Sequence, residues 1–293
     1  MSENSAYIVV GADSLVGGGL LNALKRRGHR AYGTTRRKDQ LGPERLFLDF
    51  EAEAPFQAPP DANYAFVVAA ATNYDRCEKD PQARVINEEL TPRAIANLLS
   101  QGLFVTFIST NSVFGGEKAW PHEEAAHDAQ IPYAAQKSRA EDAVRAFAKE
   151  LAAEDRLNIV RLTKIMDPNT SPLPAWFAAW SRSEAIQPFA DLIFAPMSVQ
   201  FVGEALATIG EKRVPGHLHL SGADNVSYVD LAQALAKRKG ISSDLIQPTT
   251  SIAKGIHIAF KPRFSGLGME RTSALTGLKP QPLEAVVADI VPQ

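Results

Sequence analysis

Short apolar segments alternate with longer amphipathic segments over the first 165 residues of the chain. The apolar segments are rich in β-branched and aromatic residues, which is typical of strands buried on both faces of a parallel sheet. Each amphipathic segment repeats apolar residues at intervals of three and four, as helices packed on a sheet do. Strands that alternate with helices predict a doubly wound parallel sheet, a Rossmann fold of the α/β class. The expected strands are 7–10, 31–35, 46–50, 66–71, 103–108 and 157–162, and the expected helices begin near 15, 81 and 132, the second running to 99.

The pattern changes after Lys164, where a loop of turn-forming residues is followed by a short aromatic helix that contains Trp176 and Trp180. We expect these rings to pack in a core. Ser227 and Asp230 have the spacing of a helix cap, which predicts a helix to about 239. The expected division is a Rossmann domain at 1–165, which also receives about 196–220 with a strand at 216–220, and a smaller substrate-binding lobe at 166–293.

Composition excludes several classes of protein. The chain has 293 residues, a formal net charge of -2 and ordinary globular proportions of apolar and charged residues, so nothing favours nucleic acid or an anionic membrane as partner. Cys77 is the only cysteine, which fits a reducing compartment. The sequence has no apolar stretch of membrane-spanning length and no recognisable signal peptide, and we expect a cytoplasmic location.

The turn after the first strand has the features of a dinucleotide-binding site. Gly11 permits a sharp turn, Gly17 permits close packing of the helix, and free N–H groups at the helix start attract a pyrophosphate. The spacing is G-x-x-G-x-x-G with Ser14 at the middle glycine position, where it either caps the helix or donates to a phosphate. The cofactor contacts expected here are Gly11, Asp13, Ser14, Leu15, Val16 and Gly17.

Two arginines follow the second strand, where NAD-binding sites usually place an acid for the ribose. Thr35 and Arg36 are therefore expected to contact the cofactor, with the guanidinium on the 2′-phosphate of NADP. The alternative is a solvated basic turn. Small residues at the end of the fourth strand leave room for a ligand. The remaining expected cofactor contacts are Asp49, Phe50, Ala69, Ala70, Ala71 and Asn87.

Tyr133 and Lys137 lie one turn apart on one face of the helix that Pro132 begins. A free tyrosine has a pKa of about 10, and a nearby ammonium lowers it, so the pair suits acid–base catalysis near neutral pH. The alternative is a chance pair on an ordinary helix. Ser109 and Thr110 begin a hydroxyl cluster at the end of the fifth strand, at the sheet edge where ligands bind in open α/β sheets.

Two further groups of residues are weaker candidates. His217 and His219 lie on one face of a probable strand, but no third ligand has suitable spacing, so we expect no metal site. Glu123 and Glu124 are expected in a solvated loop rather than as paired catalytic acids.

Four segments carry a resemblance to the extended short-chain dehydrogenase/reductase family, and within it to the dTDP-4-dehydrorhamnose reductase branch. They are AAATNYDRCEKDPQARVIN (69–87), STNSVFGG (109–116), YAAQKSRAE (133–141) and KPRFSGL (261–267). The resemblance implies a Rossmann fold, a nucleotide-sugar carbonyl substrate and catalytic roles for Thr110, Tyr133 and Lys137. It leaves a homodimer open. The expected activity is NADPH-dependent reduction of a keto group on a nucleotide-activated deoxysugar.

In that reaction Tyr133 protonates the developing alkoxide, and Lys137 lowers the tyrosine pKa and holds the nicotinamide ribose. Thr110 binds the carbonyl oxygen or the tyrosine hydroxyl. The segment 161–164 lacks an expected tryptophan, and the chain departs from the branch at Asn111, Ser112, Gly115, Lys261, Phe264 and Gly268. The alternatives are another enzyme of the family, such as a sugar epimerase, or a non-enzymatic NADP-binding regulatory subunit. A sugar dehydratase is disfavoured because Asn111-Ser112 replaces its Asp-Glu pair.

Overall fold

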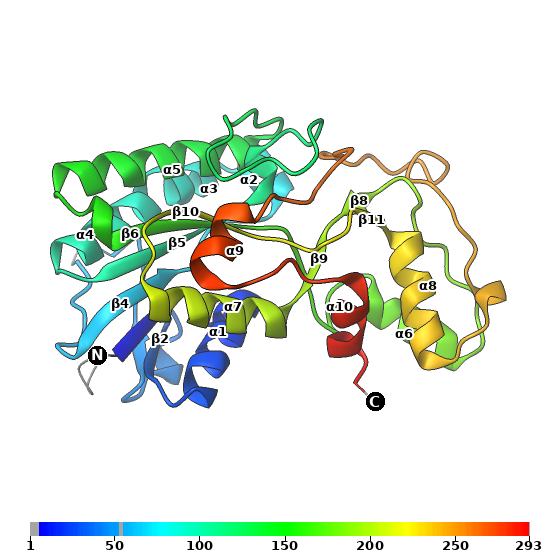
Figure 1. Ribbon diagram of the computed structural model, residues 1–293, viewed down its shortest axis with the longest axis horizontal. Helices are drawn as coiled ribbons and strands as arrows, with labels where there is room; N and C mark the ends of the chain where they lie inside the picture. Colours follow the sequence, from blue (N-terminus) through cyan, green and yellow to red (C-terminus); the bar gives the residue numbers. More distant parts are fainter. Residues whose placement is uncertain (1–5, 53–54, 293) are drawn as a thin grey trace.

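A seven-stranded parallel sheet with helices on both faces forms the larger part of the computed structural model, which describes residues 6–52 and 55–292 (Figure 1). Neighbouring strands are parallel throughout. The chain therefore has the doubly wound Rossmann fold that its pattern predicts. Across the sheet the strands are β10 (Gly216–Leu220), β6 (Leu157–Leu162), β5 (Phe104–Thr110), β4 (Ala62–Val67), β1 (Ala6–Val10), β2 (Arg30–Thr35) and β3 (Arg45–Phe47).

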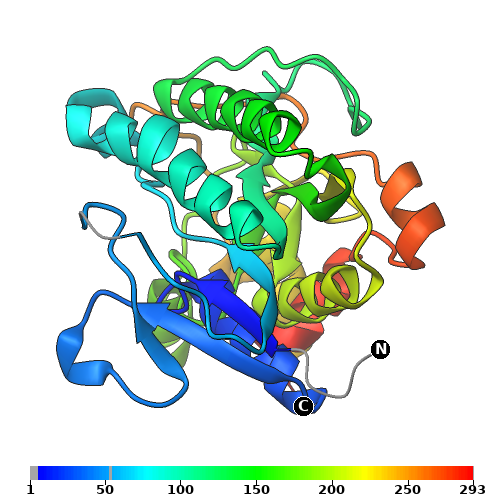
Figure 2. The ribbon, with the colours of Figure 1, turned by 90° about the vertical axis from the view of Figure 1, so that its left-hand side faces the viewer.

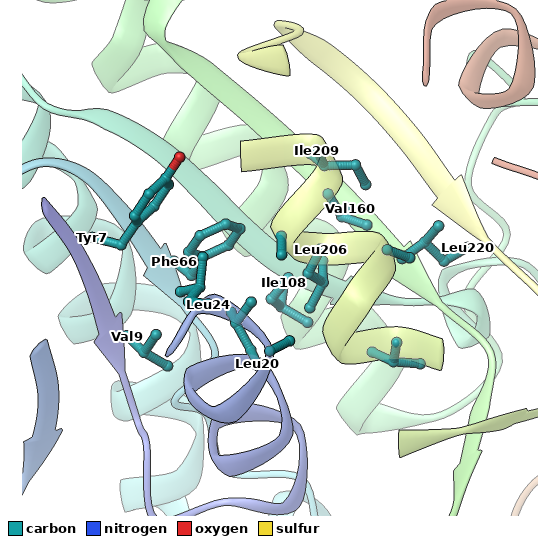
Figure 3. Packing of buried hydrophobic residues seen from close by; sticks show 14 of the residues in the cluster. Tyr7, Val9, Leu20, Leu24, Phe66, Ile108, Val160, Leu206, Ile209 and Leu220 are labelled. Carbon is teal, nitrogen blue, oxygen red and sulfur yellow. The ribbon is translucent and has the colours of Figure 1, made fainter. Parts of the chain in front are cut away.

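Two helical layers cover the sheet (Figure 2). Helices α1 (Leu15–Arg26) and α7 (Val199–Lys212) pack on one face, and α4 (Thr91–Ser100) and α5 (Pro132–Glu150) pack on the other. Each strand supplies both cores, because successive side chains point to opposite faces. Figure 3 shows the first core, in which Leu20 and Leu24 of α1 and Leu206 of α7 meet Ile108 and Val160 of the sheet.

Helices α1 and α7 approach each other closely along the sheet. A Cβ added to Gly203 would lie 2.7 Å from the carbonyl oxygen of Gly19, so only glycine permits this contact. After α7 the chain returns to the main sheet, where β10 pairs with β6. The predicted strand at 216–220 is confirmed, whereas α7 was not predicted.

Several predicted boundaries are wrong. The predicted third strand at 46–50 forms only the short β3, and the predicted fourth strand at 66–71 is displaced to β4, which begins four residues earlier and ends at Val67. Ala69–Ala71 have an apolar strand composition, but the chain leaves the sheet after Val67, where the N–H groups of Val68 and Ala69 both donate to the carbonyl of Val10. The fifth strand continues through Thr110 instead of ending at 108.

The predicted helix at 81–99 is interrupted. It consists of α3 (Pro81–Val85), a π-helical turn at Ile86–Leu90 and α4, and it is preceded by α2 (Tyr74–Lys79), which was not predicted. Asp80 separates α2 from α3 because its side chain accepts from Gln82 N and caps the second helix. Shorter 3₁₀ turns occur at Lys38–Gln40, Asn111–Val113, Glu154–Arg156 and Ser243–Leu245.

The smaller lobe packs three helices around its own core (Figure 1). Trp176 and Trp180 are buried in that core, which confirms that they pack. Ser227 and Asp230 form the predicted capping box. The remaining elements are α6 (Leu173–Ser181), α8 (Tyr228–Lys239), α9 (Glu270–Thr276), α10 (Leu283–Ile290), and two small sheets that pair β7 (Lys164–Met166) with β9 (Pro196–Ser198) and β8 (Ile193–Phe194) with β11 (Val226–Ser227).

Candidate active site

A cleft of about 1500 Å³ runs along the carboxyl ends of the strands and is closed on its far side by the smaller lobe. It includes the point where the strand order reverses between β1 and β4, which is where ligands bind in open α/β sheets. The predicted catalytic residues line this cleft together with all but two of the predicted cofactor residues. The exceptions are Gly17 and Asn87, which lie behind its wall.

The turn after β1 has the backbone geometry of a phosphate cradle. Gly11 has φ +90°, and a Cβ at this position would lie 2.8 Å from Ala69 N. Ser14 caps α1, because its hydroxyl accepts from Gly17 N at 3.1 Å and donates to Gly11 O at 2.8 Å. Of the two roles considered for Ser14, the structure therefore shows the helix cap. Gly17 permits the tight turn, since a Cβ there would lie 2.2 Å from Gly11 O.

The end of β2 presents two exposed arginines to the cleft, and unlike the nearby Arg45 neither has a carboxylate partner among the described residues. Arg45 pairs with Asp13, which also accepts a 2.7 Å hydrogen bond from Thr35. Arg36 and Arg37, by contrast, form no ion pair with any residue of 6–52 or 55–292, and both line the cleft. The acid that NAD-binding sites usually have at this position is absent from the sequence, so the turn offers positive charge to a ligand.

Asn87 holds the loop after β4 in place from behind. Its side chain accepts from Ala71 N and donates to Ala71 O, both at 2.9 Å, and it also donates to Gln136 on α5 at 2.8 Å. Ala69–Ala71 therefore form a fixed part of the cleft lining, to which Asp49 and Phe50 also belong. Asn87 acts on the cleft through this loop, and it does not line it.

Tyr133 lies in the first turn of α5, close to the end of β5. Burial raises the pKa of Tyr133 well above its usual range, the nearby Tyr74 adds to this effect, and a hydrogen bond with Thr110 offsets part of it. The Tyr74 ring lies 5.3 Å from the Tyr133 ring. Thr110 also lies 3.0 Å from the hydroxyl of Ser112. The structure thus brings the predicted Tyr–Thr pair together.

Lys137 lies one turn further along α5 and is only 2% exposed. Its Nζ donates to Ile108 O at 2.8 Å and lies 4.0 Å above the Phe107 ring. Burial lowers the pKa of Lys137 to about 7, and the Glu141 carboxylate opposes this effect. The expectation that Lys137 lowers the pKa of Tyr133 is therefore wrong for this arrangement. The ammonium is directed to a backbone carbonyl, and burial dominates at the phenol.

A buried charge cluster, made up of Glu141, Arg161, His127 and His219, lies behind these residues. Arg161 donates to Glu141 from Nη2 at 2.7 Å, and Ser109, next to Thr110, donates to the same carboxylate at 2.5 Å. Burial alone would raise the pKa of Glu141, but hydrogen bonds from His127 and Arg161, the charge of Arg161 and the Ser109 hydroxyl hold it well below its usual range. The cluster therefore fixes α5 against β5 and β6.

His219 is neutral within this cluster. Its Nε2 lies 3.2 Å from Arg161 Nη1, which can only donate, so Nδ1 carries the proton and donates to Gly268 O at 2.8 Å. Burial, with the charge of Arg161, lowers the pKa of His219 to about 3. Glu123 is also buried, and it accepts from Thr272 N at 3.0 Å. The expectation of a solvated loop holds for the exposed Glu124 but is wrong for Glu123. The Glu123 carboxylate can be buried because it accepts hydrogen bonds from both the backbone N–H and the hydroxyl of Thr272.

Asn111, one of the departures from the branch, contacts the segment at 261–267. Asn111 Nδ2 donates to the carbonyl and hydroxyl oxygens of Ser265, at 2.9 and 3.0 Å. Asn225 accepts from Ser265 N and Gly266 N, at 2.6 and 2.8 Å. Together these contacts attach the 261–267 segment of the lobe to the end of β5. Asn111 therefore helps to hold one wall of the cleft in place.

Most residues that line the cleft on the side of the smaller lobe were not predicted from the sequence. Tyr74 and Arg76 come from α2. Phe194 comes from the short strand β8, and Tyr228 is the first residue of α8. The signal that was available for α2 is Asn73, whose side chain caps it by accepting from Arg76 N. The other segments are distant in sequence and carry no local motif. Their shared position is a tertiary property.

The parallel sheet, the glycine turn and the helix with Tyr133 and Lys137 define an extended short-chain dehydrogenase/reductase. The chain matches the RmlD substrate binding domain family over residues 6–293, and it belongs to that family. A similar protein is the probable low-salt glycan biosynthesis reductase Agl14 of Haloferax volcanii, which is 24% identical over 284 residues and is covered to 94%, as is this chain.

Solved structures of this fold superpose over nearly the whole chain. MoeE5 in complex with UDP-glucose and NAD has a TM-score of 0.81 at 19% identity, with 97% of each chain covered. The dTDP-4-dehydrorhamnose reductase of Bacillus anthracis in complex with NADP has a TM-score of 0.79 at 20% identity, with 99% of this chain and 98% of that chain covered. That of Clostridium acetobutylicum has a TM-score of 0.78 at 20% identity, over 97% and 98%.

Two further observations concern other kinds of site. Within residues 6–52 and 55–292 no three His, Cys, Asp or Glu side chains are grouped as metal ligands would be. In the same residues no helix has the length and apolar character needed to cross a membrane.

Proposed function

We propose that this protein is an NADPH-dependent reductase of a keto group on a nucleotide-activated deoxysugar. The observation that carries the proposal is the shared cleft. One end of it holds the Gly11 turn and the unpaired Arg36, and the middle holds Tyr133, Thr110 and Lys137. The family, and a relative named as a glycan biosynthesis reductase, support the same class of reaction.

The residues present fit a bound NADPH. Gly11 and the start of α1 leave backbone N–H groups open to a pyrophosphate, because no Cβ fills the turn. Arg36 and Arg37 provide positive charge at the end of β2, where the adenine ribose lies in Rossmann folds. Asp13, Leu15, Val16, Thr35, Asp49, Phe50 and Ala69–Ala71 complete the proposed binding surface.

Reduction of a ketone requires a hydride and a proton, and bound NADPH supplies the hydride. The Tyr133 hydroxyl donates its proton to the developing alkoxide, and the raised pKa keeps this phenol protonated at neutral pH. Thr110, which is hydrogen-bonded to Tyr133, orients the hydroxyl toward the substrate oxygen. Lys137 is proposed to hold the ribose, and its lowered pKa makes its charge sensitive to what binds beside it.

The test is to follow NADPH oxidation by the purified protein with a panel of keto-sugar nucleotides, dTDP-4-dehydrorhamnose among them. We expect turnover with at least one member, and faster turnover with NADPH than with NADH. Interconversion of sugar nucleotides without net NADPH oxidation would indicate an epimerase. Tight NADPH binding without turnover on any member would favour a cofactor-binding regulatory subunit.

A further inference from the structure

The cations that line the cleft near the lobe differ in whether a carboxylate already neutralises them. Arg76 pairs with Asp80 at 2.9 Å, and Lys261 pairs with Asp191 at 2.5 Å. Lys164 also lines this part of the cleft, but it forms no ion pair with any residue in the described part of the chain. Its positive charge is therefore available to a ligand, whereas the other two are neutralised.

The backbone around Lys164 is held rigidly. Thr163 N donates to Leu220 O, and Thr163 Oγ1 accepts from Gly222 N, both at 3.2 Å. Lys164 itself begins β7 and lies opposite Pro196 in the parallel pair with β9. A lysine fixed at a strand end positions its ammonium better than one on a mobile loop.

The surroundings of Lys164 disfavour an unneutralised charge. Lys164 is exposed at the start of β7, but the protein around its side chain removes part of its hydration, which lowers the pKa of Lys164, and no carboxylate acts on it in the opposite direction. Lys164 itself is exposed to the cleft, so its ammonium keeps part of its hydration, and an anionic ligand in the cleft would supply the counter-ion that the protein does not. The group is thus suited to an anion that arrives with the substrate.

The position of Lys164 separates this anion from the cofactor pyrophosphate. The pyrophosphate belongs at α1, beside β1, whereas Lys164 follows β6, which is three strands away in the sheet. Strands are spaced at about 4.8 Å, so the two positions differ by about 14 Å. In the register of β5 and β6, Leu162 lies opposite Thr110, so Lys164 is only two residues beyond the level of the proposed catalytic threonine.

An aromatic wall lies next to Lys164. Phe194 and Tyr228 both line the cleft, with their ring centroids 4.4 Å apart, and Phe194 precedes by two residues the Pro196 that lies opposite Lys164. Aromatic faces bind a planar base, and an adjacent ammonium binds a phosphate oxygen. The two together have the chemistry of a nucleotide site.

We propose that Lys164 binds a phosphate oxygen of the substrate's nucleoside diphosphate and selects a nucleotide-activated sugar over a free sugar. This inference rests on the proposed function, because it assigns a residue to the substrate end of the same cleft. Lys164 is a binding and specificity residue here, and it takes no part in proton or hydride transfer.

The test measures binding of ADP, GDP, CDP, UDP and dTDP, and of the uncharged nucleosides, by calorimetry with NADP⁺ saturating so that the cofactor site is filled. The variants are Lys164→Met, which keeps the length without the charge, and Lys164→Arg, which keeps the charge. Lys212→Met is the matched control, because Lys212 is exposed in the last turn of α7 and lies outside the cleft.

We expect Lys164→Met to weaken binding of the preferred diphosphate by about ten- to a hundredfold, since hydrogen bonds to charged groups are of that strength. Lys164→Arg should retain most of the affinity, Lys212→Met all of it, and the weakening should shrink at high salt. Nucleoside binding should be unchanged. NADPH affinity, measured separately by nicotinamide fluorescence, should also be unchanged in Lys164→Met.

Three results would overturn the inference: equal diphosphate affinity in wild type and Lys164→Met, equal losses for nucleoside and diphosphate, or a loss confined to NADPH. Wild-type protein that binds NADPH but none of the five diphosphates would overturn it as well, and would leave the cofactor part of the proposed function standing. Failure to bind NADPH, together with charge-dependent diphosphate binding, would overturn the proposed reductase and keep the Lys164 site.

Discussion

Charged residues lie on two sides of the edge of the main sheet where the strands have their carboxyl ends, and the two sides differ in how far carboxylates neutralise the positive charge. In the buried charge cluster behind the strands, Glu141 and Arg161 are at most 2% exposed and bonded to each other. In the cleft in front, Arg36 and Lys164 have no partner among the described residues. We expect the neutralised charge to stabilise the frame, and we propose that the charge without a partner binds an anionic ligand.

The largest effect is expected at Tyr133, which lies between the two sides. Tyr133→Phe keeps the ring and removes the proton donor, so turnover should fall by about a hundred- to ten-thousandfold while the melting temperature changes little. Tyr32→Phe is the control, since it removes another buried tyrosine hydroxyl, bonded to Asp61 and outside the cleft. The measurement is NADPH oxidation by folded protein. Near-normal turnover of folded Tyr133→Phe would falsify the catalytic assignment.

Breaking the buried charge cluster should reduce stability. Arg161→Met leaves the Glu141 carboxylate buried without its ion-pair partner, and such a change destabilises a protein by about 3–5 kcal/mol. Arg145→Met, on the exposed face of α5, should change stability by less than about 1 kcal/mol. Denaturant unfolding measures both. Equal effects of the two substitutions would show that the cluster does not stabilise the frame.

The same cluster should give the protein a pH dependence in acid. The folded pKa of Glu141 is below its unfolded value of about 4.3, so its pairing stabilises the fold fully above that pH and is lost as the pH falls toward the folded pKa. Glu141→Gln should therefore flatten the unfolding free energy between about pH 5 and pH 3. Glu150→Gln, exposed on the same helix, should leave the wild-type slope. An unchanged slope in Glu141→Gln would assign the acid sensitivity to other carboxylates.

On the cleft side, Arg36→Ala should weaken NADPH binding by about ten- to a hundredfold and leave NADH binding unchanged, since only NADPH carries the 2′-phosphate. Lys212→Met again serves as the control for loss of a cation. Titration of nicotinamide fluorescence measures both cofactors. Equal affinity of the wild-type protein for NADPH and NADH would contradict this assignment of Arg36.

The smallest effect is expected at Ser14. Ser14→Gly removes the side-chain cap of α1. Glycine is itself a favourable residue at the N-cap position, so the free energy of unfolding should fall by only a few tenths of a kcal/mol. NADPH affinity should not improve, because the serine hydroxyl is turned toward Gly11 O and Gly17 N. A clear gain in affinity would show that the serine side chain obstructs the cofactor.

The cofactor half of the cleft could be predicted from sequence because each of its parts is local. Gly11, Ser14 and Arg36 lie within two residues of a strand or helix end, and such ends have recognisable residue patterns. The lobe half could not, because Tyr74, Phe194 and Lys164 come from three separate segments that only the tertiary fold brings together. The pKa of Tyr133 was mispredicted for the same reason, since burial depends on the whole packing around it.

The contact of Gly19 with Gly203 has a consequence for how this chain can diverge. Helix α7 comes late in the sequence yet lies against α1 with no room for a side chain, and β10 follows it into the main sheet. The smaller lobe is therefore not a module that recombination can exchange as one block from 166 to the end. Such an exchange would also replace α7, whose surface has to pack closely against α1. New substrate specificities are more accessible through local changes in the segments at 167–195 and 221–268, which α7 and β10 separate.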